Sequence, residues 1–184
     1  MGSLTGEQKS IITGKLLGDG SLRRKLNTLL EINHSYKQKD YVFWQYTKLK
    51  NFVSTPPKIR KSGVNRFSYR FTTVSFSDLN PFYEGFYSKG SKSIPTTLNL
   101  NSLSLAVWFM DDGSKSRSTV YLNTQQFSYG DQNKLILALC NLGLYSSLNR
   151  DKSYLRIRLL KKSVYRFKEL VAPYMIESML YKLP

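Results

Sequence analysis

Two apolar stretches of the chain have helical spacing, and both end at an Asp-Gly pair. The first follows a capping box formed by Thr5 and Gln8, and its apolar residues recur three and four positions apart. This pattern predicts a helix that ends near Gly18. We expect Lys15 to lie on the outward face of this helix.

The second apolar stretch starts at Asn101 or Ser102, either of which favours a helix start, and ends at Gly113. Both stretches carry small residues on one side, namely Thr13, Gly14 and Gly18 in the first and Ala106 in the second. Small side chains let two helix axes approach closely. We therefore expect the helices to pair and to bring Asp19 and Asp112 together at one end.

Beyond each Asp-Gly pair the hydrophobic period changes to two, which is typical of strands with one buried face. The alternation covers residues 26–33, 66–72, 117–125 and 154–159. Further helical patterns occupy residues 40–53, 77–87, 131–142 and 163–181, and Pro81 and Pro173 start or kink the last helix of each set. The aromatic residues of the first of these helices are expected to pack in the fold, not to stack on bases: Tyr41, Phe43, Trp44 and Tyr46.

The same order of elements, helix, two strands, helix, two strands, helix, occurs twice. A lysine shortly before a proline repeats as well, since Lys92 lies 73 residues after Asp19 and Lys182 lies 70 residues after Asp112. These repeats predict a duplicated α+β fold with two pseudo-symmetric αββαββα halves. The halves are residues 1–92 and 101–184, joined by a linker at 93–100.

Each predicted sheet has one polar, basic face. Alternate residues form this face. They are Arg66, Ser68, Arg70 and Thr72 in the first half and Arg156 and Arg158 in the second half, and the face is extended by Arg117, Tyr121, Asn123 and Gln125. The intervening residues are apolar and are expected to pack: Phe67, Tyr69, Phe71, Leu155, Ile157 and Leu159. An ordinary solvated face is the alternative interpretation, but such faces usually mix charge signs.

The overall charge agrees with a nucleic-acid partner. The chain has 28 Lys and Arg against 12 Asp and Glu, a net charge of +16 spread over both halves. An anionic membrane surface is the weaker alternative, because no apolar run approaches the roughly 20 residues that span a bilayer. We find no signal or transit peptide, and the segment from Met1 to Ser3 is typical of a remnant of cloning.

The inventory of metal ligands narrows the chemistry. One cysteine and one histidine exclude an intrachain disulfide and a thiolate or imidazole zinc site. Cys140 is expected in the core and His34 at a strand end or groove. Any metal must then bind oxygen, which favours Mg²⁺. Asp19 and Asp112 are the candidate ligands, and Lys92 and Lys182 the candidates for offsetting charge in phosphodiester hydrolysis.

Residues 12–20 and 105–113 resemble the two motifs of the LAGLIDADG homing endonucleases, and the Lys-Leu-Pro ending at 182–184 is similar to the monomeric, mitochondrial intron-encoded branch. The resemblance implies that the motif helices form the interface between the halves and that two antiparallel sheets form a saddle over DNA. It further implies a staggered double-strand cut across the minor groove of a long asymmetric target. Leu17 departs from the family pattern, which has an acid there.

The resemblance also implies roles for individual residues. Two or more Mg²⁺ ions would be bound by Asp19 and Asp112, with the main-chain carbonyls of Gly18 and Asp111. Lys92 and Lys182 would be catalytic, and polar strand residues would order water, for which Glu31 and Asn123 are the candidates and Gln125 the substitute. DNA contacts are expected from Arg23, Arg24, Arg66, Ser68, Arg70, Thr72, Lys115, Arg117, Tyr121, Gln125, Arg156 and Arg158.

Two other functions remain open from the sequence. An intron maturase would bind its own intron RNA, with or without cutting DNA. A non-catalytic DNA-binding regulator would tolerate loss of both aspartates. The abundance of Lys, Asn, Tyr and Phe, which AT-rich coding favours, agrees with the mitochondrial origin that the resemblance suggests.

Overall fold

A computed structural model describes residues 2–61 and 63–184, so that Met1 of the suspected cloning remnant lies outside the described residues. The first half contains α1 (Gly6–Leu17), β1 (Ser21–Arg24), β2 (Thr28–Ser35), α2 (Lys39–Leu49), β3 (Lys58–Lys61), β4 (Phe67–Thr72) and α3 (Asn80–Phe86). Its strands form one antiparallel sheet in the order β1-β2-β4-β3. Single 3-10 turns precede or follow the shorter helices, at Tyr36–Gln38, Lys50–Phe52 and Ser77–Leu79.

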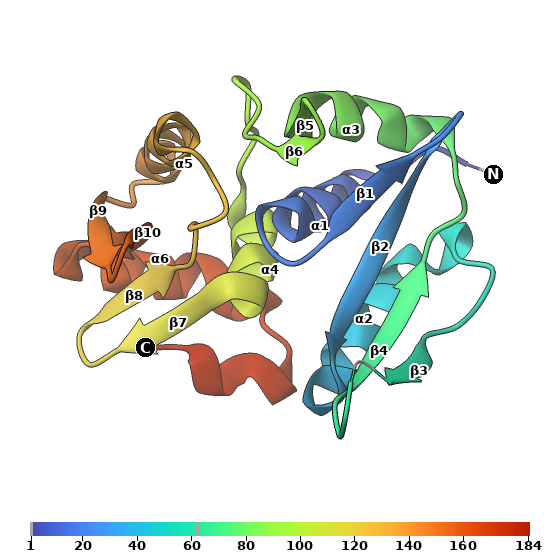
Figure 1. Cartoon of the computed structure of the whole chain (residues 1–184). Helices are drawn as coiled ribbons and strands as arrows, with labels where there is room; N and C mark the ends of the chain where they lie inside the picture. Colours follow the sequence, from blue (N-terminus) through green and yellow to red (C-terminus); the bar gives the residue numbers. More distant parts are fainter. Residues whose placement is uncertain (1, 62) are drawn as a thin grey trace.

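The second half repeats this arrangement. It contains α4 (Ser102–Asp112), β7 (Gly113–Ser116), β8 (Thr119–Leu122), α5 (Tyr129–Asn141), β9 (Ser146–Asp151), β10 (Tyr154–Leu159) and α6 (Val164–Val171), with 3-10 turns at Lys161–Ser163, Ala172–Tyr174 and Glu177–Lys182. Its sheet has the order β7-β8-β10-β9, which matches the first sheet strand for strand. The predicted α+β fold with two αββαββα halves is therefore confirmed (Figure 1).

The segment between the halves is more structured than a plain linker. A short hairpin of β5 (Tyr87–Ser88) and β6 (Ser91–Lys92) precedes it. Within the segment, Ile94 and Leu100 are buried in the hydrophobic core. Burial of these two side chains fixes the connection against both halves.

The two motif helices, α1 and α4, pack against each other at the centre of the molecule (Figure 1). Both start with the expected caps, since Thr5 and Gln8 form a capping box and Asn101 forms another with Ser104. Close approach requires Gly14, because a Cβ atom there would lie 2.5 Å from the carbonyl oxygen of Ser104 and 2.6 Å from Cβ of Val107. The prediction of a close helix pair is therefore confirmed.

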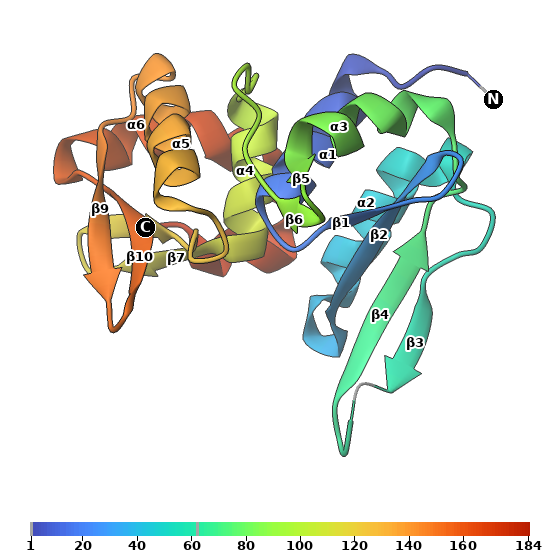
Figure 2. The same cartoon turned by 45° about the horizontal axis from the view of Figure 1, so that its top comes forward.

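The two sheets flank this helix pair. The β3–β4 and β9–β10 hairpins project to the same side of the molecule, whereas α3 and α5 lie on the other side (Figure 2). In the first half α2 covers the inner face of the sheet, where Tyr41 is buried and Trp44 and Tyr46 pack against core residues. Phe43 is 37% exposed and contacts the ring of Tyr69 edge-on, so that these aromatic residues pack as expected.

Four side chains lie in environments that the sequence did not predict. Lys15 was expected to face outward, but it is fully buried because α1 is covered by α4 on one side and by its own sheet on another. Cys140 is exposed, since the buried face of α5 is formed by Leu135, Ala138 and Leu139. Phe67 is 48% exposed at the open start of β4, and Ser68 beside it is buried.

Two elements also differ from the predicted ranges. In the alternating stretch 117–125 only β8 is a strand, and Arg117 lies in the turn before it. The partner strand β7 comes earlier, directly at the end of α4. The long helix expected at 163–181 ends at Val171. Pro173 lies in a 3-10 turn after it, because proline lacks the N–H that would continue an α-helix.

Candidate active site

Asp19 and Asp112 are presented at the same end of the central helix pair. Asp19 follows the cap of α1, and Asp112 is the last residue of α4. The Asp19 side chain is 46% exposed, which leaves its carboxylate open to a ligand. Burial, followed by the negative charges of Asp19 and Asp111, raises the pKa of the Asp112 carboxyl to about 7. The neutral form of the Asp112 carboxyl is therefore favoured more than in an exposed aspartate.

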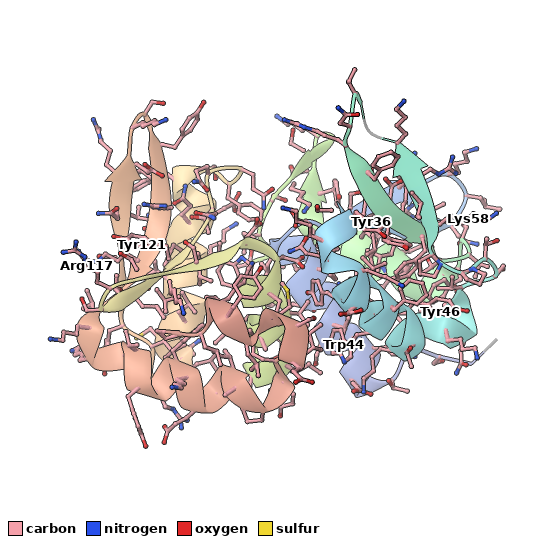
Figure 3. The ribbon with its side chains drawn as sticks, turned by 90° about the horizontal axis from the view of Figure 1, so that it is seen from below. Tyr36, Trp44, Tyr46, Lys58, Arg117 and Tyr121 are labelled. Atoms are coloured by element: carbon pink, nitrogen blue, oxygen red, sulfur yellow. The ribbon has the colours of Figure 1, made fainter. Side chains whose placement is uncertain are left out.

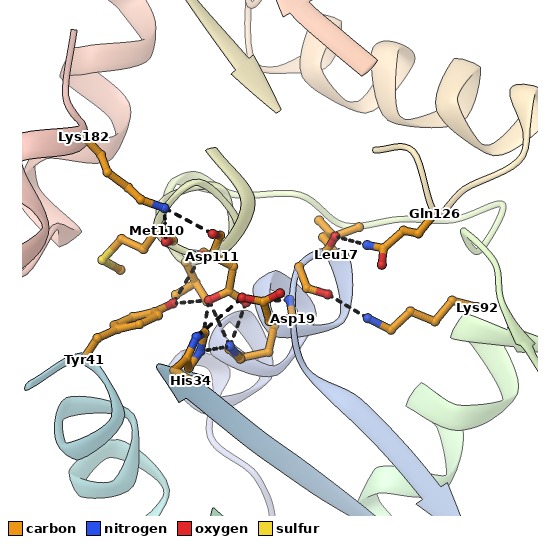
Figure 4. Close-up of polar contacts among 12 residues, drawn as sticks. Leu17, Asp19, His34, Tyr41, Lys92, Met110, Asp111, Gln126 and Lys182 are labelled. Atoms are coloured by element: carbon orange, nitrogen blue, oxygen red, sulfur yellow. Dashed lines mark hydrogen bonds and ion pairs between the residues drawn. The ribbon is translucent and has the colours of Figure 1, made fainter. Parts of the chain in front are cut away.

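The two lysines predicted from the repeat reach equivalent positions in the halves (Figure 4). Lys92 donates a hydrogen bond to the carbonyl oxygen of Gly18 at 2.7 Å. Lys182 donates to the carbonyl oxygens of Met110 at 2.5 Å and Asp111 at 3.1 Å. Burial, with Lys15 nearby, lowers the pKa of Lys92 to about 8, and burial also lowers the pKa of Lys182. Each lysine thus lies beside the residue that precedes a candidate metal-binding aspartate.

The Asp111 side chain has a role that the sequence analysis missed. The Nζ atom of Lys15 donates to both of its carboxylate oxygens, at 2.9 and 2.7 Å, and both side chains are fully buried. The hydroxyl of Tyr41 donates to the same carboxylate at 2.8 Å, and the main-chain N–H of Asp19 donates to it at 3.0 Å. A buried carboxylate with this many hydrogen-bond donors is held in one orientation.

His34 completes this cluster. Its Nε2 atom lies 2.6 Å from Nζ of Lys15, and its Nδ1 atom lies 3.4 Å from Oδ2 of Asp19. Burial, with the adjacent Lys15 charge, lowers the pKa of His34 to about 3, so that the imidazole is neutral near pH 7. Because the Lys15 ammonium donates to Nε2, the ring proton belongs on Nδ1, which faces Asp19. The expectation that His34 lies near a strand end is met, since β2 ends at Ser35.

The polar strand residues expected to order water, Glu31 and Asn123, differ in their surroundings. Glu31 forms ion pairs with Arg23 and Arg70, each at 2.7 Å, on the outer face of the first sheet. The main-chain N–H of Asn123 donates to the carbonyl oxygen of Asp112 at 3.1 Å, which places Asn123 beside the site. Gln125 is exposed, whereas its neighbour Gln126 donates to the carbonyl oxygen of Leu17 at 3.2 Å. Gln126 is a site residue that sequence spacing did not reveal.

The basic surface lies on both sheets (Figure 3). In the second half the Arg156 guanidinium lies 4.1 Å from the ring centre of Tyr121, and Arg158 is exposed opposite Tyr121 in register. Lys115 and Arg117 are exposed at the β7–β8 hairpin. In the first half the exposed residues include Arg23, Arg24 and Arg66, while Arg70 and Thr72 are partly buried. The structure adds Lys58 and Arg60 of β3, which line a pocket with Arg70.

Two groups of ligand atoms could hold a hard divalent cation, and the arrangement suits the ion at one of them and not at the other. Asp19, His34 and Asp111 bring ligand atoms within 4.8 Å of one another, but the ammonium group of Lys15 already occupies the space between His34 and Asp111. The carboxylates of Asp19 and Asp112 and the carbonyl oxygens of Gly18 and Asp111 offer oxygen atoms only, with Lys92 and Lys182 donating to the two carbonyls. Such a set suits Mg²⁺ or a similar cation.

Comparison with known proteins identifies the family. The sequence profile described as the LAGLIDADG DNA endonuclease family matches residues 9–167, which is most of the chain. The chain belongs to this family. The matched range includes the ends of α1 and α4, together with Asp19 and Asp112.

Individual relatives and solved structures agree with the family assignment. The chain is 30% identical to the cytochrome b mRNA maturase bI2 of Saccharomyces cerevisiae over its full length, and it spans 48% of that protein. It is 29% identical to a probable intron-encoded endonuclease of Wickerhamomyces canadensis, with 98% of the chain and 85% of the relative covered.

Among solved LAGLIDADG structures, the homing endonuclease I-WcaI bound to its DNA recognition sequence superposes with a TM-score of 0.93 at 26% identity, covering all of this chain and 88% of that one. I-DmoI, at 14% identity and a TM-score of 0.56 over 89% of this chain and 96% of that one, shares the fold. No helix in the described part of the chain is long and apolar enough to cross a membrane.

Proposed function

We propose that this chain is a homing endonuclease, a site-specific enzyme that cuts both strands of a long, asymmetric DNA target with a staggered cut across the minor groove. One observation carries the proposal. The two halves present Asp19 and Asp112 together at the end of the α1–α4 pair, each beside a lysine, between two basic sheets. The DNA-bound relative I-WcaI, which has the same fold over the whole chain, supports it.

The cofactor we propose is Mg²⁺, with two or more ions held by Asp19, Asp112 and the carbonyl oxygens of Gly18 and Asp111. Bound there, it would activate water and stabilise the leaving oxygen of the phosphodiester. Lys92 and Lys182 hold positive charge where negative charge develops on the scissile phosphates. Asn123, whose main-chain N–H donates to the carbonyl oxygen of Asp112, is the proposed residue for ordering water, whereas Glu31, the other candidate, is engaged with Arg23 and Arg70.

The two halves, 1–92 and 101–184, would act as one monomer through the 93–100 linker, and each sheet would contact its own half of the target. The proposed DNA contacts are Arg23, Arg66, Arg70, Thr72, Lys115, Arg117, Tyr121, Gln125, Arg156 and Arg158, with Lys58 and Arg60 added. Ser68 and Arg24 are left out, because Ser68 is buried and Arg24 pairs with Glu84 of α3 at 2.8 Å. Because the strand sequences of the halves differ, the target is expected to be asymmetric. Intron-encoded relatives in two fungi support an origin in an organellar intron.

Selection from a randomised plasmid library tests this function. The protein is incubated with the library and Mg²⁺, and the linearised plasmids are sequenced. We expect one long asymmetric site, cut on both strands, and no linear product when EDTA replaces Mg²⁺. Absence of any enriched site, or cutting that continues in EDTA, would contradict the proposal.

A second function, RNA maturation, is favoured by one finding. The yeast relative that matches the whole chain is named a cytochrome b mRNA maturase. We propose that binding of the intron RNA that encodes this chain accompanies the nuclease activity. Splicing of that intron with and without the protein tests this, and equal splicing rates in the two reactions would rule it out.

DNA binding is expected to weaken steeply with salt, because a saddle of basic side chains displaces counterions from many phosphates. A contact set of six to ten phosphates implies a loss of about 10³ to 10⁵ in affinity between 50 and 200 mM salt. Fluorescence anisotropy of a labelled target across this salt range measures the slope. A flat dependence would be incompatible with contacts from both sheets.

Arg158→Ala is expected to reduce target affinity by about 1–3 kcal/mol and to relax the preference at one base pair, because its exposed guanidinium lies on the predicted base-reading face. Arg166→Ala is the matched control, since Arg166 lies on α6, outside the sheets, and pairs with Glu169. Binding to a panel of single-base target variants provides the measurement. Equal losses for both variants would show that Arg158 contributes only general charge.

A further inference from the structure

The buried ion pair of Lys15 and Asp111 has no part in the mechanism proposed above, yet it lies directly beneath the candidate metal site. Both side chains are fully buried, and the carboxylate accepts from Lys15, Tyr41 and the main chain of Asp19. A buried charge pair of this kind brings a large desolvation penalty, which is offset only when geometry and hydrogen bonding are nearly complete. Here they are nearly complete, and the last donor belongs to a candidate metal ligand.

Two contacts lead from this pair to Asp19. Oδ2 of Asp111 accepts the main-chain N–H of Asp19 at 3.0 Å, which fixes the backbone from which the Asp19 side chain projects. The ring of His34 lies between Lys15 and the Asp19 carboxylate, with Nε2 at 2.6 Å from the lysine and Nδ1 at 3.4 Å from Oδ2. Lys15 therefore holds both the acceptor beneath the Asp19 backbone and the ring beside its carboxylate.

Within the described parts of the chain, the second half has no equivalent support. At the position that corresponds to Lys15, α4 carries Trp108, whose indole nitrogen is buried without a hydrogen-bond partner. At the position that corresponds to Asp111, the first half carries Gly18. Among the described residues, no side chain donates a hydrogen bond to the carboxylate of Asp112 or forms an ion pair with it.

We infer that Lys15 is a positioning residue for one half of the active site, which acts through Asp111 and His34 to fix Asp19 and leaves Asp112 without such support. This inference rests on the proposed endonuclease function. Its consequence is that the two strands of the target depend on different supports. A carboxylate displaced by about 1 Å can slow a reaction by about 100-fold, so loss of the support is expected to affect one strand far more than the other.

The main test replaces both partners at once. Lys15→Met with Asp111→Ala removes the pair without leaving an unpaired buried charge, which limits the loss of stability. His34→Leu is a second variant that removes the ring nitrogens and leaves the ion pair in place. Lys48→Met with Glu7→Ala is the matched control, because it removes an ion pair of 2.7 Å at the other end of α1 and leaves Lys15, Asp111 and His34 in place.

Strand-resolved cleavage of an end-labelled target is the first measurement. In the double variant and in His34→Leu we expect cleavage of one strand, the same in both, to slow by about 100-fold relative to the other, so that nicked DNA accumulates. The Lys48→Met, Glu7→Ala control is expected to keep the parent ratio of the two strand rates. Equal slowing of both strands, or no slowing, would overturn the inference, because a general structural defect affects both halves.

Hydrogen exchange of the Asp19 amide gives a measurement independent of DNA cleavage. In the double variant its protection is expected to be lost, whereas the Gly113 amide, which bonds to the carbonyl of Phe109, keeps its protection as an internal reference. Unchanged protection at Asp19 would overturn the positioning role even if the parent protein cut no DNA. A parent that cuts nothing while Asp19 loses protection in the variant would refute the proposed function alone.

Discussion

Asp19→Asn and Asp112→Asn are each expected to abolish double-strand cleavage while leaving affinity for the target largely unchanged. Asparagine keeps the shape of the side chain but removes the negative charge that holds a divalent cation. Each carboxylate is proposed to serve the cut in one strand, so loss of either leaves at most a nick and no linear product. We expect the rate of linear product formation to fall at least about 100-fold.

Plasmid linearisation in Mg²⁺ gives the rate, and anisotropy of a labelled target in Ca²⁺ gives the affinity. Glu169→Gln is the charge-matched control, since this acid is exposed on α6 and its ion-pair partner among the described residues is Arg166. It is expected to cut at the parent rate. If both aspartate variants cut as fast as the parent, Asp19 and Asp112 are not the catalytic acids, and a non-catalytic DNA-binding function gains support.

Gly14→Val is expected to lower the free energy of unfolding by about 3 kcal/mol or more. This is the largest effect on stability that we predict for a single substitution. A Cβ atom at this position would lie 2.5 Å from a backbone oxygen of α4 and 2.6 Å from Cβ of Val107. A backbone atom cannot rotate away, so the helices must separate. Separation would also move Asp19 relative to Asp112.

Urea denaturation, followed by circular dichroism, measures the free energy of unfolding. Gly6→Val is the matched control, because Gly6 lies in the first turn of the same helix and a Cβ there meets nothing within 4 Å. Its stability is expected to stay within about 0.5 kcal/mol of the parent. Similar losses in both variants would mean that the helix interface tolerates a larger side chain at Gly14.

The repeat in the sequence predicts the architecture well because the same local patterns occur in both halves. Caps, periodicity and the Asp-Gly endings are encoded within a few residues, and they locate α1 and α4 and their paired aspartates. Lys92 and Lys182 were found from their spacing alone, and both reach the carbonyl groups at the helix ends. Their catalytic roles stay predictions.

The cluster around Asp111 could not be read from the sequence in the same way. Its contacts join Lys15 to a residue 96 positions away and Tyr41 to one 70 positions away. A lysine in an apolar helix usually lies on the side that faces solvent. Lys15 is buried instead, because α4 packs across it. Glu31 shows the same limitation, since its partners Arg23 and Arg70 lie on separate neighbouring strands.

The central helix pair also determines which halves can associate. Gly14 faces Val107, and Lys15 bonds to Asp111, so that a small residue meets a larger one and a base meets an acid across the interface. Two copies of the first half paired in this geometry would bury two lysines without a carboxylate partner. Two copies of the second half would place valine against valine and bury two unpaired aspartates. Each mismatch is unfavourable by several kcal/mol, and the interface therefore selects the heterologous pairing within one chain over self-association of like halves.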